Sequence, residues 1–281
     1  MSAPAKRCVG RVCATLWAAL CWAGPCQAKE EPLWEYGLGV GAVAFEDYRG
    51  SDSSHVYPLP IPYLLYNGKF LKADRDGVRG TLFNQDRIEL NLSVNATTPV
   101  RNDRERNGMP DLKSTLELGP SLDLHLLRSE DARVKFDLRM PLRAAFTVEA
   151  SPRVIGWTFT PRFNLDVADP FGFAGWRLGL LTGPLFAERR YHDYFYTVAP
   201  QYATAARPAY QAPGGYAGTQ AITSLSKRFP RFWVGAYARR DTLAGAVFVD
   251  SPLVRRESYW SAGFGISWMI HRSSTMVEVP D

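Results

Sequence analysis

The sequence predicts an all-β fold, namely an antiparallel transmembrane β-barrel of about twelve strands, with ten as the fallback. Three observations predict it. Apolar and polar residues alternate with a period of two over long segments, short and long connections alternate between these segments, and aromatic residues gather near the segment ends. A tilted transmembrane strand needs about 9–11 residues, and the alternating segments have roughly that length.

A secretory signal peptide is predicted for residues 1–28. Lys6, Arg7 and Arg11 precede a short apolar run, and small residues lead to an expected cleavage after Ala28. The run is about half the roughly 20 residues that a membrane-spanning helix needs. All four cysteines lie in this segment, which leaves the exported chain without disulfides or thiolate metal ligands. The exported chain is also near neutral, so nucleic-acid binding has little support.

One of the alternating segments runs from Leu116 to Leu126. Leucines and one proline occupy every second position, and the positions between them include Glu117, Asp123 and His125. Side chains at alternate positions of a strand point to opposite faces of the sheet. In a soluble sandwich the apolar face would pack in the core, whereas in a membrane barrel it would meet lipid. Alternation alone does not separate these folds, so the prediction of a barrel depends on the connections, the aromatic residues and export.

Turn residues divide the exported chain into about twelve expected strands. Their links alternate between short turns, such as Asn67-Gly68, and long loops, such as 188–215. Short periplasmic turns and long external loops are typical of outer-membrane barrels. We therefore expect a barrel over residues 29–272 and a C-terminal periplasmic tail at 273–281. The expected strands span residues 34–46, 56–66, 69–74, 77–84, 87–97, 112–127, 132–147, 155–168, 175–187, 216–229, 231–240 and 257–270.

The charged face of these strands is expected to line the lumen. Charges with little water around them are costly unless paired, so we expect ion pairs across neighbouring strands. One strand carries more basic than acidic residues, which would favour anions if the lumen conducts. The interpretation we prefer is a filled barrel in which these arginines pair with neighbouring carboxylates. The expected lumen-facing charged residues are Arg87, Glu89, Glu117, Asp123, Arg133, Lys135, Asp137, Arg139, Arg143, Arg162 and Asp166.

Aromatic residues near the expected strand ends, such as Trp157, Tyr259 and Trp260, suit the two membrane interfaces, where amphipathic rings are favoured. The last expected strand also contains a polar, glycine, apolar, aromatic order that resembles the signal read by the outer-membrane barrel assembly machinery. Such strands usually finish the chain, whereas here a tail from Met269 to Asp281 follows. The residues of this signal are Ser261, Gly263, Ile266 and Trp268.

No catalytic residue set, cofactor site or metal site is predicted. A barrel hydrolase needs a base that is hydrogen-bonded to a nucleophile or activates a water. His192 and His55 lie in expected external loops, where such a site would assemble, but we interpret both as solvated loop residues. His125 is interpreted as one member of a polar network inside the barrel. The histidines are spread too widely for metal-ligand spacing.

Five groups of residues occur in a characteristic order along the chain. They are Gly37-Leu38-Gly39-Val40-Gly41; Tyr57-Pro58-Leu59-Pro60-Ile61-Pro62-Tyr63 with Tyr66 and Phe70; Leu116-Glu117-Leu118-Gly119; Asp193-Tyr194-Phe195-Tyr196 with Tyr202-Ala203-Thr204-Ala205-Ala206; and Ser251-Pro252-Leu253-Val254. Their order and spacing together resemble the MipA/OmpV family, the MltA-interacting proteins of the outer membrane. The resemblance covers nearly all of the exported chain.

The resemblance implies a non-enzymatic outer-membrane scaffold. Such a barrel brings a murein-cleaving lytic transglycosylase together with a bifunctional penicillin-binding protein that synthesises murein. Its other expected partners are outer-membrane lipid and the barrel assembly machinery. Some relatives are instead discussed as adhesins or porin-like proteins, so an adhesin-type surface protein and a small-solute channel stay open as alternatives. The chain departs from many members in its loop from Arg101 to Arg106 and in its C-terminal tail, which bears on partner identity more than on fold.

Overall fold

A computed structural model describes residues 29–279 except 68–70, 75–76, 86 and 102. The predicted signal peptide therefore lies outside the described residues. The main sheet is antiparallel and contains the strands from β2 to β14. These are β2 (Trp34–Glu46), β3 (Ser54–Asn67), β4 (Leu71–Asp74), β5 (Gly77–Gln85), β6 (Ile88–Thr97), β7 (Thr115–Arg128), β8 (Val134–Thr147), β9 (Val154–Phe159), β10 (Arg162–Ala168), β11 (Trp176–Ala187), β12 (Gly215–Arg228), β13 (Phe232–Thr242) and β14 (Ser258–Arg272).

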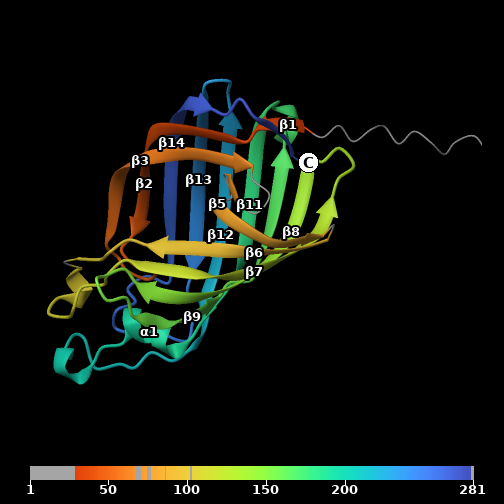
Figure 1. Cartoon of the computed structure of the whole chain (residues 1–281). Helices are drawn as coiled ribbons and strands as arrows, with labels where there is room; N and C mark the ends of the chain where they lie inside the picture. Colours follow the sequence, from red (N-terminus) through yellow and green to blue (C-terminus); the bar gives the residue numbers. More distant parts are fainter. Residues whose placement is uncertain (1–28, 68–70, 75–76, 86, 102, 280–281) are drawn as a thin grey trace, which may run out of the picture.

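The main sheet closes on itself into a barrel (Figure 1). β9 and β10 both pair with β8 on one side and with β11 on the other, so together they act as one of twelve strands. The break between them falls at Thr160 and Pro161, because proline has no N–H for the strand ladder. On β11, Gly183 leaves room for this break, since a Cβ there would stand 2.1 Å from the Pro161 carbonyl oxygen. The predicted antiparallel barrel of about twelve strands is confirmed.

The two ends of the barrel differ (Figure 1). At one end, here called the turn end, short connections such as 229–231 join the strands, and β1 (Lys29–Pro32) pairs with β15 (Met276–Val279). The opposite end, here called the loop end, carries the long connections and helix α1 (Arg189–Tyr196). The expected tail thus contributes a short strand that pairs with the start of the described chain. Among the described residues, no helix is long and apolar enough to cross a membrane.

The two faces of the barrel wall separate polar from apolar side chains. On β7, Glu117 and Asp123 are buried, whereas Leu116 and Leu118 are each 39% exposed. A barrel wall with apolar side chains outside and polar side chains inside is the arrangement that lipid requires. The alternation therefore belongs to an outer-membrane type of barrel and not to a soluble sandwich. Other apolar side chains exposed on the wall are Val40, Val56, Phe163, Leu225, Phe264 and Ile270.

The long connections pack together at the loop end into a cap, which we define as residues 47–53, 103–114, 188–214 and 243–257. Helix α1 lies within it. The Tyr196 ring stacks on the Phe248 ring with the centroids 3.7 Å apart. The cap therefore has its own apolar core, separate from the lipid-facing wall. Buried residues of this core include Tyr48, Leu112, Phe195, Tyr196, Val198, Leu243, Phe248 and Leu253.

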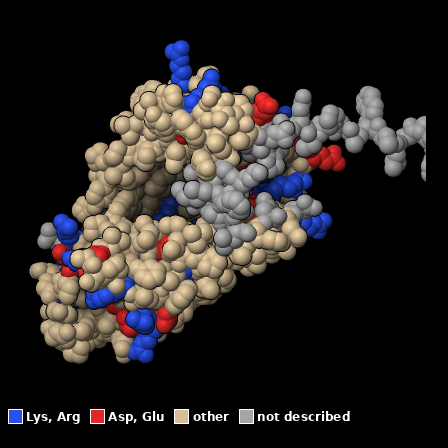
Figure 2. Space-filling view, viewed as in Figure 1, with Lys and Arg blue, Asp and Glu red and all other residues tan. Residues whose placement is uncertain are grey.

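On one side the barrel wall contains two unpaired strand edges. Among the described residues, β3 pairs with β4 only at Tyr66 and Asn67, and the rest of β3 has β2 as its one partner. Also among the described residues, the β5–β6 pairing ends at Leu92, so Val94–Thr97 of β6 pair with β7 alone. Figure 2 shows a hollow between β3 and β6 in this face of the molecule.

Candidate functional site

Ion pairs among residues of β7 and β8 occupy the middle of the lumen. The Arg143 guanidinium lies 3.8 Å from Glu117, and the Arg139 guanidinium lies 3.8 Å from both Asp123 and Asp137. None of these five side chains is more than 12% exposed. Buried charges are stable only when they are paired and hydrogen-bonded. These two arginines of β8 therefore pair with neighbouring carboxylates, in the manner of a filled barrel.

Hydroxyl, amide and imidazole groups extend this network. Ser121 and Asn91 donate hydrogen bonds to Asp123 at 2.6 and 3.0 Å. His125 Nδ1 lies 2.9 Å from Asp137 Oδ1, and Arg128 donates to the same oxygen at 2.6 Å. His125 is thus one member of a polar network inside the barrel, as the alternation predicts.

Arg87 and Arg133 are exceptions to the predicted lumen set. They lie one residue before β6 and β8 respectively, and both are exposed. The Arg133 guanidinium pairs with Asp131 in the turn, at 3.4 Å. The prediction extended the alternation into turns, where the chain reverses and long side chains reach water, so it was wrong for these two arginines. The partly buried members of the predicted set, all within strands, are Glu89, Lys135, Arg139, Arg162 and Asp166.

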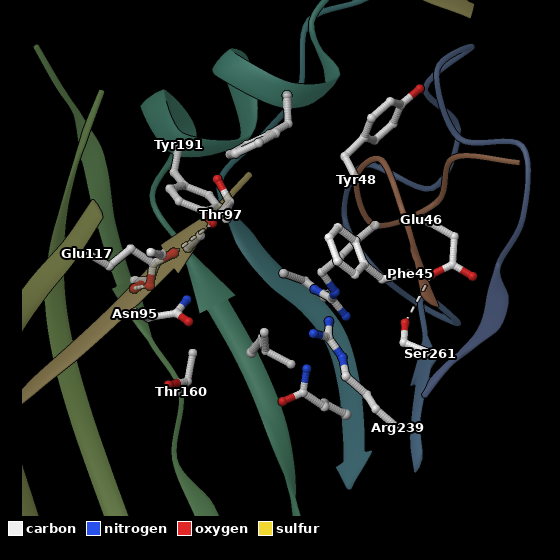
Figure 3. A pocket seen from close by; sticks show the side chains of 18 of the residues that line it. Phe45, Glu46, Tyr48, Asn95, Thr97, Glu117, Thr160, Tyr191, Arg239 and Ser261 are labelled. Carbon is white, nitrogen blue, oxygen red and sulfur yellow. Dashed lines mark hydrogen bonds between the residues drawn. The ribbon is translucent and has the colours of Figure 1, made fainter. Parts of the chain in front are cut away.

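A chamber of about 510 Å³ lies in the loop-end half of the lumen, beneath the cap. Its lining comes from most of the barrel strands, from the segment after β2, and from α1 and Phe248 of the cap. The chamber has two unlike walls, one built around Glu117 and the other around Arg239 (Figure 3). Labelled around it in Figure 3 are Phe45, Glu46, Tyr48, Asn95, Thr97, Glu117, Thr160, Tyr191, Arg239 and Ser261.

Asp241 organises the basic wall of the chamber. It is 0% exposed, and its carboxylate accepts hydrogen bonds from Arg49, at 3.0 Å, and from Arg239. Arg49 also donates to the Ala217 carbonyl oxygen at 2.6 Å. The adjacent Gly218 has φ +96°, and a Cβ there would stand 3.1 Å from an Arg49 nitrogen. Glycine is needed at this position both for its backbone conformation and for the approach of the guanidinium.

The basic wall was not predicted from the sequence. Arg239 and Asp241 are two residues apart, so alternation could have placed them on one face of β13. Arg49 follows β2 in a loop, where no periodicity exists to place it. Burial lowers the pKa of Arg49, but the neighbouring Tyr259 and Asp241 outweigh burial and raise it overall. The guanidinium is therefore charged at any physiological pH.

Tyr191 joins the cap to the barrel wall. Its hydroxyl donates to one Glu117 oxygen at 3.0 Å, and Thr158 donates to the other at 3.2 Å. Burial raises the pKa of Tyr191 well above its ordinary value, and the Glu117 carboxylate raises it further. The Tyr191 hydroxyl therefore keeps its proton and remains a hydrogen-bond donor. A second contact within the loop end is the hydrogen bond from the Tyr196 hydroxyl to the Arg49 carbonyl oxygen, at 2.9 Å.

His192 is not the solvated loop residue that the sequence suggested. It is 1% exposed, its Nδ1 donates to the Pro213 carbonyl oxygen at 2.7 Å, and its ring packs against Phe248 with the centroids 4.6 Å apart. Burial lowers the pKa of His192, against the opposing effect of the Pro213 carbonyl. The imidazole is therefore neutral at pH 7.

The other loop histidine, His55, is exposed as expected, and its Nε2 lies 3.2 Å from Asp47. Within the described part of the chain, neither His55 nor His192 is hydrogen-bonded to a serine hydroxyl. No three His, Asp or Glu side chains among the described residues gather as the ligands of a metal ion would.

The predicted barrel-assembly residues all lie on β14. Ser261 and Gly263 are buried, Ile266 is partly buried, and Trp268 is 48% exposed. Recognition of these residues by the assembly machinery stays a prediction. Tyr259, at the start of the same strand, was expected at a membrane interface, but it is 5% exposed and lines the chamber. Its position two residues before Ser261 places it on the inward face of the strand.

Comparison with solved structures returned six matching chains. One is the crystal structure of the P. putida toluene transporter TodX, with 11% sequence identity and a TM-score of 0.27, covering 86% of this chain and 68% of that chain. A likeness at that TM-score adds nothing to the fold, which rests on the strand pairing of this chain. No curated protein sequence matches.

A family description matches the chain over residues 38–270, from the first long strand of the barrel to the last. The matched family is described as MltA-interacting protein MipA. The match takes in the lumen network, the chamber and almost the whole barrel. The chain belongs to the MipA family.

Proposed function

We propose that this protein is a non-enzymatic outer-membrane scaffold that links a murein-degrading lytic transglycosylase to a murein synthase, a bifunctional penicillin-binding protein. The observation that carries the proposal is membership of a family described as MltA-interacting over residues 38–270. In this proposal the loop end faces the cell exterior and the turn end faces the periplasm, where the murein enzymes act. An export signal at residues 1–28 and insertion by the barrel assembly machinery belong to the same proposal.

The geometry supports a role that depends on contact with partners. The cap has a buried apolar core, and ion pairs occupy the middle of the lumen. The middle of the lumen and the cap core are therefore used to hold the barrel together. Such a rigid barrel suits a scaffold, because a partner surface on it needs no ordering when the partner binds.

The turn end offers an exposed aromatic contact for a periplasmic partner. Between β10 and β11, Phe171 and Phe173 are 90% and 63% exposed. Phe171 has φ +56°, a backbone conformation that bulky residues rarely adopt. Large aromatic side chains are frequent anchors of protein interfaces. We propose this pair as part of the surface that a murein enzyme contacts.

Site-specific crosslinking in intact cells tests the scaffold. A photoreactive benzoyl-phenylalanine at Phe171 should crosslink a lytic transglycosylase or a penicillin-binding protein, identified by mass spectrometry. The same amino acid at Tyr202, in the cap, is the matched control and should crosslink neither. Recovery of no murein enzyme from position 171, or equal recovery from both positions, would reject the proposal.

A small-solute channel is the second candidate, and the chamber favours it. Arg49, Arg143, Arg162 and Arg239 line that chamber, which suits an anionic solute. The cap residues over the chamber argue against free passage in the resting barrel. Planar-bilayer recording separates the two candidates, because single-channel steps with anion selectivity would support the channel and a silent bilayer would remove it.

A further inference from the structure

The chamber presents positive charge on its basic wall. Arg49 and Arg239 both line the chamber, and their side chains are 19% and 30% exposed. Their shared carboxylate, Asp241, is 0% exposed and is not among the lining residues. Two guanidinium groups therefore meet the chamber, while the one carboxylate between them is hidden from it. A second carboxylate, brought by a ligand, would complete the pairing of these two cations.

The acidic groups of the chamber are already engaged. Glu117 accepts hydrogen bonds from Tyr191 and Thr158 and lies 3.8 Å from Arg143. The Glu46 carboxylate accepts from the Ser261 hydroxyl at 3.2 Å (Figure 3), and the Asp47 carboxylate lies 3.2 Å from His55 Nε2. A cationic ligand would have to displace these contacts, whereas an anion meets guanidinium groups directly.

Apolar side chains complete the lining. They come from both the barrel wall and the cap, so one part of a ligand would lie against rings and aliphatic chains while another part met the arginines. A volume of about 510 Å³ lies within the range of roughly 300–1,000 Å³ that is usual for small-molecule sites. The main apolar lining residues are Phe45, Leu181, Phe195 and Ile222.

The chamber borders the unpaired side of the barrel wall. Asn95 and Thr97, which line it, belong to the part of β6 that among the described residues pairs with β7 alone. The hollow in Figure 2 lies between this edge and β3. A ligand with an apolar body is suited to a chamber that adjoins the lipid-facing side of the wall, because apolar surface is favoured away from water.

We propose that the chamber beneath the cap is a binding site for a small amphipathic organic anion, whose carboxylate is held by Arg49 and Arg239 and whose apolar body lies against Phe45 and the cap. This site goes beyond the scaffold function and does not depend on it. The recognition is directional, since the charged group of the ligand is held at the basic wall and its apolar part points toward the aromatic lining.

Calorimetric titration of the protein in lipid nanodiscs tests the proposal. The probe is 3-phenylpropanoate, and the matched control ligand is 3-phenylpropanamide, which has nearly the same size and shape but no charge. Empty nanodiscs correct for partition of either compound into lipid. The carboxylate should bind about tenfold or more tightly than the amide, because a charge-assisted pair with two guanidinium groups is lost in the amide.

Substitution on β13 locates the site. Arg239→Gln should weaken binding of 3-phenylpropanoate by about tenfold or more, and Arg239→Lys, which keeps the charge, should recover part of the affinity. Arg240→Gln is the matched control, because Arg240 is exposed and its guanidinium lies over the Trp260 ring instead of the chamber. Gel mobility before and after heating confirms that each variant is a closed barrel.

Three results would overturn the proposal. They are failure of the carboxylate to bind at millimolar concentration, equal affinity for the carboxylate and the amide, and equal effects of the Arg239→Gln and Arg240→Gln variants.

Discussion

The contact between Tyr191 and Glu117 should control how often the cap opens. Tyr191→Phe removes one hydroxyl and leaves the ring that packs in the cap. The lost hydrogen bond is 3.0 Å long, partly buried, and made to a carboxylate. Hydrogen bonds to charged groups contribute about 1.5–3 kcal/mol, so local opening of α1 should become about ten- to a hundredfold more frequent.

Limited proteolysis measures this opening. Trypsin cleaves after Arg189 and Arg190, which lie in α1, and cleavage of a helix requires the helix to unfold locally. When reclosing is faster than cleavage, the cleavage rate follows the population of the open state. The rate of appearance of the fragment that ends at residue 190 should therefore rise about ten- to a hundredfold in Tyr191→Phe, while heat-dependent gel mobility of the barrel stays unchanged.

Two further variants make the test specific. Tyr194→Phe is the control, because the Tyr194 hydroxyl bonds only backbone groups of Lys113 and should contribute about 0.5–1.5 kcal/mol. In a Glu117→Gln background the hydrogen bond is no longer charged, so the effect of Tyr191→Phe should shrink to that smaller range. Cleavage of Tyr191→Phe within twofold of the unmodified chain, or an equal effect in both backgrounds, would refute the reasoning.

Three other perturbations have defined outcomes. Gly218→Ala should destabilise the loop end by about 1–3 kcal/mol in urea unfolding, because φ is +96° and the new Cβ would stand 2.2 Å from the Thr242 carbonyl oxygen. An unchanged urea midpoint would contradict this backbone argument. Phe264→Arg, on the exposed outer face, should lower the free energy of unfolding in vesicles by about 2–4 kcal/mol, and Phe264→Leu should lower it much less. Equal losses of stability would mean that this face does not meet lipid. Burial lowers the pKa of His192 in the folded cap below the value of about 6.5 that it has in the unfolded chain. The neutral imidazole therefore stabilises the cap above about pH 6.5, and this stabilisation is lost as the pH falls toward the lowered pKa of the folded state. Tryptic cleavage in α1 should accelerate over that pH window in the unmodified chain and less in His192→Gln; equal acceleration would assign the effect to another group.

The strands could be predicted because their physical cause is local. Each residue of β7 faces lipid or lumen according to its parity, so Leu116 and Glu117 separate onto two faces without reference to any other strand. The same rule places His125 inside the barrel and would have placed Tyr259 there. Short turns and long loops further restrict how consecutive strands pair. Alternation and connections, together with the expected export signal, were therefore enough to predict an antiparallel membrane barrel.

The cap and the chamber depend on contacts between residues far apart in the chain, and only the tertiary structure decides them. Arg49 meets Asp241, and Tyr191 meets Glu117, across 192 and 74 positions. Loops have no repeating geometry, so the sequence carried no signal that His192 would be buried. Closure of the barrel brings these groups together at one end of the lumen. Buried charges there are stable only when they are paired.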